Sequence, residues 1–308
     1  MPPRPIMIAV GGDSGSGKRT LCRGLLQIFG DERITTICLD DYHSLDRAQR
    51  KSVGFTALDP RANNFAAMEE DLWALREGRA IDKPVYDRAS GTFRGREHVE
   101  PREILIVYGL FPLYTRALRS LFDVTVWLEP EAELKIAWTL QRDMRQRGCD
   151  EAAARTDLRS REPDIARYIE PQVRHADLTV RFYRPRDWNS HGDAAKLSGR
   201  IRKGSRFRPL DYAEFESAAT SIRFSETAGG GYPETIIELD GLIEPRIADA
   251  VEARIWSHIT TGRQRPARIG EFIDADGTPR TGHALALAQL LIARRVVLIE
   301  EELLQMAP

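Results

Sequence analysis

The chain has few cysteines, no long apolar run and almost no net charge, and each shortage excludes a class of protein. Its 308 residues contain three cysteines, Cys22, Cys38 and Cys149, which are too few and too scattered for a disulfide framework or a zinc site. The longest apolar run covers residues 104–114, whereas a bilayer-spanning helix needs about 20 apolar residues. The sequence therefore predicts no membrane helix.

Charge and composition indicate a folded protein that does not bind nucleic acid through its net charge. Lysine and arginine number 45 and aspartate and glutamate 46, so bulk charge does not favour nucleic acid. Hydrophobic residues make up 42% of the chain, which is enough for a sizeable core. The apolar stretch near the N-terminus is too short for a signal peptide and lacks a small-residue cleavage site. We therefore expect a cytoplasmic protein with neither nucleic acid nor a membrane as partner.

Apolar runs and helical periodicity alternate through the first 182 residues. Short buried strands are predicted at 6–10, 34–39, 104–107, 124–128 and 178–182. Amphipathic helices are predicted from the glycine-rich turn to Gly30, from Asn63 or Asn64 to Gly78, and over 131–147. Strands that alternate with helices predict an α/β fold, in which a mostly parallel sheet carries helices on both faces.

The character of the sequence changes after residue 182. Residues 183–210 are polar and predict loop and edge structure, whereas 220–224 and 235–239 alternate like strands around Gly229–Gly231. Helices are predicted at about 245–258 and 282–304. We expect an α/β domain over 1–182 and a smaller α+β extension over 183–308, packed on the same sheet.

A glycine-rich segment between the first predicted strand and helix carries the clearest chemical signal. Residues 12–18, called the phosphate loop below, fit the pattern GxxxxGK, in which small residues let backbone N–H groups surround phosphate oxygens and the lysine adds a point charge. The alternative is an ordinary glycine-rich turn. The candidate residues for binding the ATP phosphates are Gly12, Asp13, Ser14, Gly15, Ser16, Gly17, Lys18, Arg19 and Thr20.

A polar cluster, residues 38–47, follows the second predicted strand. Open α/β sheets bind ligands at the carboxyl ends of their strands, so the cluster is expected opposite the phosphate loop. A carboxylate of this cluster could accept the proton of a substrate hydroxyl, while His43 and Arg47 could hold a substrate phosphate. The alternative is a polar surface loop without chemistry.

Several strings of the sequence resemble the phosphoribulokinase family, particularly its plant and cyanobacterial branch. They are CLDDYHSLDR (38–47), TALDPRANNF (56–65), QRDMRQRG (141–148), REPDIARYIEPQ (161–172) and HADLTV (175–180). ELDGLIEP (238–245) and the stretch 270–289 are also similar to that branch, so the resemblance is expected to extend over nearly the whole chain. The related uridine kinases share the phosphate loop but not the first two strings.

The resemblance implies a P-loop kinase fold and phosphorylation of ribulose 5-phosphate at its 1-hydroxyl, with ATP and Mg²⁺ as cofactors. By the same resemblance Asp40 is the general base, and the residues that bind sugar phosphate are His43, Arg47, Arg142 and Arg147. From the residues alone, Arg142 and Arg147 could instead belong to a solvated helix face. A homodimer is one possible assembly.

Three positions depart from the pattern of the family. Arg19 stands where a hydroxyl follows the loop lysine, Tyr108 where a strand-end glutamate is expected, and Thr139 where the helix carries a lysine. Each change removes a group that handles Mg²⁺ or phosphate charge. The alternatives to a phosphoribulokinase are therefore a catalytically silent relative with a regulatory role and a kinase similar to uridine kinase. Ser16 replaces the partner of Cys38, so no thiol switch is expected.

Overall fold

A computed structural model describes residues 3–147, 150–185, 197–203, 221–229, 232–259, 264–266, 268–274 and 277–306. The chain divides into two compact units. Unit 1 contains Met1–Lys18, Glu32–Thr125 and Ala132–Ala176, and unit 2 contains Arg19–Asp31, Val126–Glu131 and Asp177–Pro308. Among the described residues, no helix has both the length and the apolarity that a bilayer span requires.

Three parallel strands form the sheet core of unit 1. β5 (Ile104–Gly109) pairs with β1 (Ile6–Gly12) on one side and with β2 (Ile34–Cys38) on the other. All residues of β1 are buried, as expected for a parallel strand covered on both faces, whose sequence is a continuous apolar run. The three strands were predicted from such runs, and their carboxyl ends meet at one edge of the sheet.

Helices of unit 1 follow the predicted positions closely. Asn64 caps α3 (Phe65–Arg76) by accepting a hydrogen bond from the Ala67 amide, and α5 spans Ala132–Arg147, so both expected helices are confirmed. The unit also contains α2 (Arg47–Val53), α4 (Arg116–Ser120) and α6 (Glu151–Asp164). A π-helical turn (Ile165–Ile169) and a 3₁₀ segment (Glu170–His175) follow α6.

A hairpin that the sequence did not predict completes unit 1. β3 (Ile81–Asp87) pairs antiparallel with β4 (Thr92–Val99), and the register shifts between Pro84 and Tyr86. Proline within a strand weakens the strand signal, and β4 is almost entirely exposed, so its charged residues show no apolar alternation.

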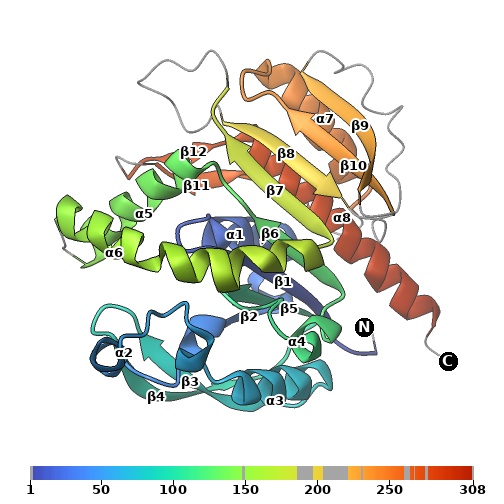
Figure 1. Cartoon of the computed structure of the whole chain (residues 1–308). Helices are drawn as coiled ribbons and strands as arrows, with labels where there is room; N and C mark the ends of the chain where they lie inside the picture. The colour runs from blue at the N-terminus through green and yellow to red at the C-terminus, as the bar shows by residue number, and fades with distance from the viewer. Residues whose placement is uncertain are drawn as a thin grey trace. The chain divides into compact units, whose positions relative to one another are not determined.

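Unit 2 contains a run of antiparallel strands. β6 (Val124–Leu128), whose first two residues belong to unit 1, pairs parallel with β7 (Leu178–Tyr183). Antiparallel pairing then joins β7 to β8 (Ser198–Lys203), β8 to β10 (Tyr232–Leu239), and β10 to β9 (Ile222–Gly229). The strand order β2-β5-β1-β6-β7-β8-β10-β9 confirms the predicted α/β fold with a largely parallel sheet (Figure 1).

The expectation of loop and edge structure over 183–210 was wrong at β8. This strand lies between β7 and β10 rather than at an edge. Its one large apolar residue, Ile201, is flanked by Arg200 and Arg202, so the sequence shows little apolar alternation. The rest of the interval up to residue 210, apart from 183–185 and 197, lies outside the described residues.

Helix α8 (His283–Gln305) packs against α1 (Lys18–Phe29) within unit 2. Leu21, Leu25 and Ile28 of α1 are fully buried, as the sequence predicted. Gln289 of α8 is buried against Gly24, where a Cβ atom would lie 2.1 Å from its amide group. Both predicted C-terminal helices are confirmed, the other being α7 (Pro245–Ser257). β11 (Glu271–Ile273) and β12 (Pro279–Thr281) form a small hairpin.

Candidate functional site

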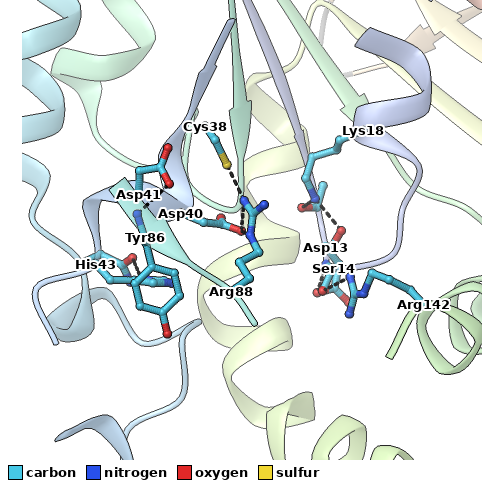
Figure 2. Close-up of polar contacts among 12 residues, drawn as sticks. Asp13, Ser14, Lys18, Cys38, Asp40, Asp41, His43, Tyr86, Arg88 and Arg142 are labelled. Atoms are coloured by element: carbon cyan, nitrogen blue, oxygen red, sulfur yellow. Dashed lines mark hydrogen bonds and ion pairs between the residues drawn. The ribbon is translucent and has the colours of Figure 1, made fainter. Parts of the chain in front are cut away.

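The phosphate loop connects β1 to α1, as predicted. The Ser16 amide donates to the Asp13 carbonyl at 3.2 Å and closes the turn. The Lys18 ammonium donates to the carbonyl oxygens of Gly12 and Asp13, both at 2.7 Å (Figure 2). The loop therefore holds its own lysine against two backbone carbonyls.

Helix α5 packs directly against the phosphate loop within unit 1. Arg142 donates from Nη1 to the Ser14 hydroxyl at 2.9 Å, and Thr139 Oγ1 donates to the Ser14 carbonyl at 3.3 Å. Gly15 has φ +78°, and a Cβ atom there would lie 2.0 Å from Thr139 Oγ1, so both backbone conformation and space require glycine. Arg142 thus lies at the loop, whereas the side chain of Arg147 lies outside the described residues.

Asp40 follows β2 and is held by an arginine that sequence reasoning missed. Arg88 donates to Asp40 Oδ2 from Nη2 at 3.0 Å and from Nε at 3.2 Å, and the same Nη2 lies 2.6 Å from the Cys38 sulfur (Figure 2). Arg88 comes from the turn between β3 and β4. The turn sequence contains glycine, but nothing in it indicates which carboxylate the arginine faces.

Arg47 holds the turn that presents Arg88. Its backbone amide donates to the Gly91 carbonyl at 2.9 Å. Its guanidinium donates to the Ala89 carbonyl at 3.2 Å and also to the carbonyl of Arg88. Asp46 supplies the N-cap of the helix that begins at Arg47, with a complete capping box. The predicted phosphate ligand Arg47 is therefore tied to the β3–β4 turn in this structure.

Electrostatics join Asp40 to the phosphate loop. Burial lowers the pKa of Lys18, while the negative charges of Asp40 and then Asp13 raise it. Arg142 also lowers this pKa. These directions agree with the sheet geometry, in which β1 and β2 flank β5 and end at the same edge, with the phosphate loop after β1 and Asp40 after β2.

His43 is buried, with 7% of its surface exposed. Its Nδ1 lies 2.8 Å from Asn63 Oδ1. The Asn63 amide group donates to the carbonyls of Asp59 at 2.9 Å and Ala57 at 3.2 Å, which leaves the amide oxygen as an acceptor facing the ring. In the neutral imidazole Nδ1 therefore donates, and Nε2 is the acceptor.

The charge state of His43 follows from its surroundings. Burial is the largest influence and lowers its pKa, and Arg50 lowers it further, while Asp40 opposes both. The ring also packs edge-on against Tyr86, with centroids 4.8 Å apart. A neutral His43 is suited to accept a hydrogen bond from a hydroxyl, and less suited to neutralise a phosphate.

The carboxylates near the loop bear on whether the site fits Mg²⁺. Each of the following has a cationic partner within 3.0 Å: Asp13 with Lys135, Asp40 with Arg88, Asp41 with Lys83 and Asp143 with Arg142. The strand-end position carries Tyr108, which is half-buried and lies opposite Val10 and Cys38 in the sheet register. Magnesium prefers carboxylate and water oxygens in octahedral geometry. Because the carboxylates near the loop in the described part of the chain already bind cations and the strand end carries a phenol, these residues do not fit direct ligation.

Comparisons with known proteins agree with the fold and the motifs. A model described as the phosphoribulokinase / uridine kinase family matches residues 7–188. Phosphoribulokinase from Synechocystis is 47% identical over 177 residues, which cover 58% of this chain and 53% of that protein. The chloroplastic phosphoribulokinase of Spinacia oleracea is 41% identical over 192 residues, or 57% of this chain and 48% of that protein. The chain thus matches about half the length of these relatives.

Two further comparisons extend the relationship. A uridine kinase from Alkaliphilus metalliredigens is 30% identical over 181 residues, which cover 58% of this chain and 87% of that enzyme. The solved structure of phosphoribulokinase from Rhodobacter spheroides shares the fold, with a TM-score of 0.56 at 18% identity over 83% of this chain and 96% of that one. The family model ends at residue 188. The resemblance at 238–245 and 270–289 stays a prediction.

Proposed function

The chain belongs to the phosphoribulokinase / uridine kinase family, and from this premise we propose that it transfers the γ-phosphoryl group of ATP to the 1-hydroxyl of ribulose 5-phosphate. The observation that carries the proposal is geometric: the phosphate loop follows β1 and Asp40 follows β2, and both strands pair in parallel with β5, so a carboxylate and the loop lie at the same edge of the sheet. The higher identity to phosphoribulokinases than to a uridine kinase supports the sugar phosphate as substrate.

The phosphate loop would hold the polyphosphate of ATP. Its backbone N–H groups and the start of α1 favour negative charge, and Lys18 would exchange its two carbonyl partners for phosphate oxygens. Arg142, at the Ser14 hydroxyl, would neutralise charge on the transferring group. Kinases of this kind usually use Mg²⁺ with ATP. Among the described residues the carboxylates near the loop are paired with cations, and no step here depends on the metal.

Asp40 would act as the general base. As the sugar 1-oxygen bonds to the γ-phosphorus, its proton passes to the Asp40 carboxylate, and the bond to the bridging oxygen breaks to release ADP. Arg88 would orient the Asp40 carboxylate by its two hydrogen bonds. His43 Nε2 would accept a hydrogen bond from a second sugar hydroxyl, and we propose Arg47 and Arg147 as ligands of the 5-phosphate.

A panel of acceptors tests this proposal. ADP release would be followed with ribulose 5-phosphate, ribulose without its phosphate, and uridine, each with and without Mg²⁺. Turnover that requires the 5-phosphate supports a sugar-phosphate kinase. Turnover with uridine and not with the sugar phosphate would contradict it in favour of a nucleoside kinase.

One observation favours a second candidate, a nucleotide-binding relative without turnover. Arg88 forms an ion pair with Asp40, and Asp13, Asp41 and Asp143 near the loop also have cationic partners. Arg88 binds Asp40 at Oδ2 and is compatible with a general base, so this candidate depends on the other paired carboxylates and on the neutral Tyr108, which would hold Mg²⁺ poorly. Under this alternative the protein binds ATP but releases no ADP with any acceptor of the panel.

A further inference from the structure

The phosphate loop contains a buried carboxylate, which is an unexpected charge in a site for polyanions. Asp13 is 9% exposed. Its Oδ1 accepts the backbone N–H of Ser14 at 2.6 Å, so it occupies a donor that a phosphate could otherwise use. A negative charge at this place repels an incoming polyphosphate, and burial strengthens the repulsion.

Lys135 supplies the opposite charge from helix α5. Its ammonium lies 2.9 Å from Asp13 Oδ2, and its side chain is 23% exposed. Lys135, Thr139 and Arg142 are spaced by four and three residues, so they lie on one face of the helix. All three contact residues 13–15 of the loop.

We propose that Lys135 is the counter-ion of the phosphate loop, which neutralises Asp13 and thereby lets the loop accept a polyphosphate. The inference rests on the nucleotide binding in the proposed function. It assigns Lys135 a positioning role through Asp13 rather than contact with the transferred group. Thr139, one turn later, has no charge. Among the described side chains of this face, the ammonium of Lys135 and the guanidinium of Arg142 are the cations that contact the loop.

The charge role and a merely structural role predict different results for Asp13. Asp13→Asn keeps an oxygen that can accept the Ser14 N–H but removes the negative charge. If the charge matters, this variant binds ATP at least as tightly as the wild type, because Lys135 is then free to attract phosphate. If the Asp13–Lys135 ion pair only stabilises the packing of α5 against the loop, Asp13→Asn lowers the affinity for ATP as Lys135→Met does.

Isothermal titration calorimetry with ATP and with ADP tests the inference. Lys135→Met is expected to lower the affinity for ATP about tenfold or more, because it leaves the buried charge of Asp13 without its partner. The affinity for ADP should fall less. Lys51→Met, a matched change at an exposed lysine of α2, should stay within about twofold. Asp13→Asn in the Lys135→Met background should return the ATP affinity to within about threefold of wild type. Lys135→Arg, which keeps the charge, should resemble the wild type.

Other outcomes overturn the inference. Equal ATP affinities of Lys135→Met and Lys51→Met would overturn it. So would an Asp13→Asn variant that loses as much ATP affinity as Lys135→Met. If Lys135→Met does not fold, Asp13→Asn still decides between the two roles: ATP affinity at or above that of the wild type supports the charge role, and a weaker affinity supports the structural role. A wild type that binds ATP but does not phosphorylate ribulose 5-phosphate contradicts the proposed function alone, since affinity and turnover are measured separately.

Discussion

Burial and charged neighbours together set the pKa values of individual side chains in this site. Lys18 and His43 are both depressed in pKa by burial, and Asp40 opposes the shift in each case. Asp40 itself is bound by Arg88 at 3.0 Å. The chemistry of the site therefore depends on pairs of residues, and changes at one member are expected to alter the other.

Nucleotide affinity is expected to depend on Lys18. Lys18→Ala removes the point charge at the phosphate loop. In calorimetry this variant should bind ATP about tenfold or more weakly than wild type, a loss of about 1.4 kcal/mol of binding free energy. Lys51→Ala, at an exposed position, is the control. Equal affinity of Lys18→Ala and wild type would contradict the assignment of residues 12–18 as a phosphate loop.

Protein stability is expected to fall as the pH drops below about 6.5, with His43 as one cause. The unfolded chain takes up a proton near that pH, whereas the lowered pKa of His43 delays protonation in the folded protein. The contribution is thus present above the unfolded pKa and is lost as the pH falls. Urea unfolding at about pH 7.5 and about 5.5 should show a smaller difference for His43→Gln than for wild type.

The exposed His98 on β4 provides the matched control for this measurement. His98→Gln removes one histidine without touching the buried network around His43. An equal pH dependence of wild type and His43→Gln would show that His43 is not the group responsible.

At the scale of elements, a buried polar contact within unit 2 joins α8 to α1. In unit 2 the Gln289 side chain accepts from the Gly270 amide at 2.8 Å and donates to the Thr20 carbonyl at 3.3 Å. It fits into α1 because Gly24 has no side chain. The first turns of α1 are therefore fixed by a buried polar side chain of α8, not by apolar packing alone.

Gly24→Ala tests this helix contact. The added Cβ atom would lie 2.1 Å from the Gln289 amide, and overpacking of this kind typically costs about 1–3 kcal/mol. The free energy of unfolding should fall by about that amount in the wild type and by clearly less in a Gln289→Ala background. The same loss in both backgrounds would mean that Gln289 is not the obstacle.

The strand ends of unit 1 give a second prediction at this scale. Tyr108 of β5 lies opposite Cys38 of β2, at the position where the family resemblance expects a metal-associated glutamate. Without a carboxylate there, wild-type protein should bind ATP with an affinity that changes by less than about threefold when Mg²⁺ is removed.

Tyr108→Glu, alone or with Arg19→Ser, supplies the comparison. Both variants should show greater Mg²⁺ dependence of ATP binding and higher activity than wild type. Robust wild-type turnover with ordinary Mg²⁺ dependence, unimproved by these substitutions, would refute an impaired metal site.

At the scale of the whole molecule, the sequence predicted most of the elements and part of the site. β1, β5 and β6 were recognisable because strands buried on both faces are continuous apolar runs. The phosphate loop was recognisable because its small residues and lysine have fixed spacing. The division into domains at residue 182 stays a prediction.

The missed features have physical reasons. Arg88 contacts Asp40 across 48 residues of chain, from the turn of the β3–β4 hairpin. The sequence does not predict this hairpin, because Pro84 weakens the strand signal of β3 and the exposed β4 shows no apolar alternation. Lys135 and Asp13 meet through the packing of α5 against the loop, which periodicity does not specify. Local patterns identify elements, whereas contacts between elements distant in sequence depend on the assembled fold.

The most direct measurement of the central claim is the identity of the product formed from ATP and ribulose 5-phosphate. We predict that phosphorus NMR detects ribulose 1,5-bisphosphate, that Asp40→Asn lowers its rate of formation by about 10²–10⁴-fold, and that Asp46→Asn, which keeps an N-cap in the same string, does not. Absence of the bisphosphate with wild-type protein that binds ATP, or equal rates for Asp40→Asn and wild type, would contradict the account.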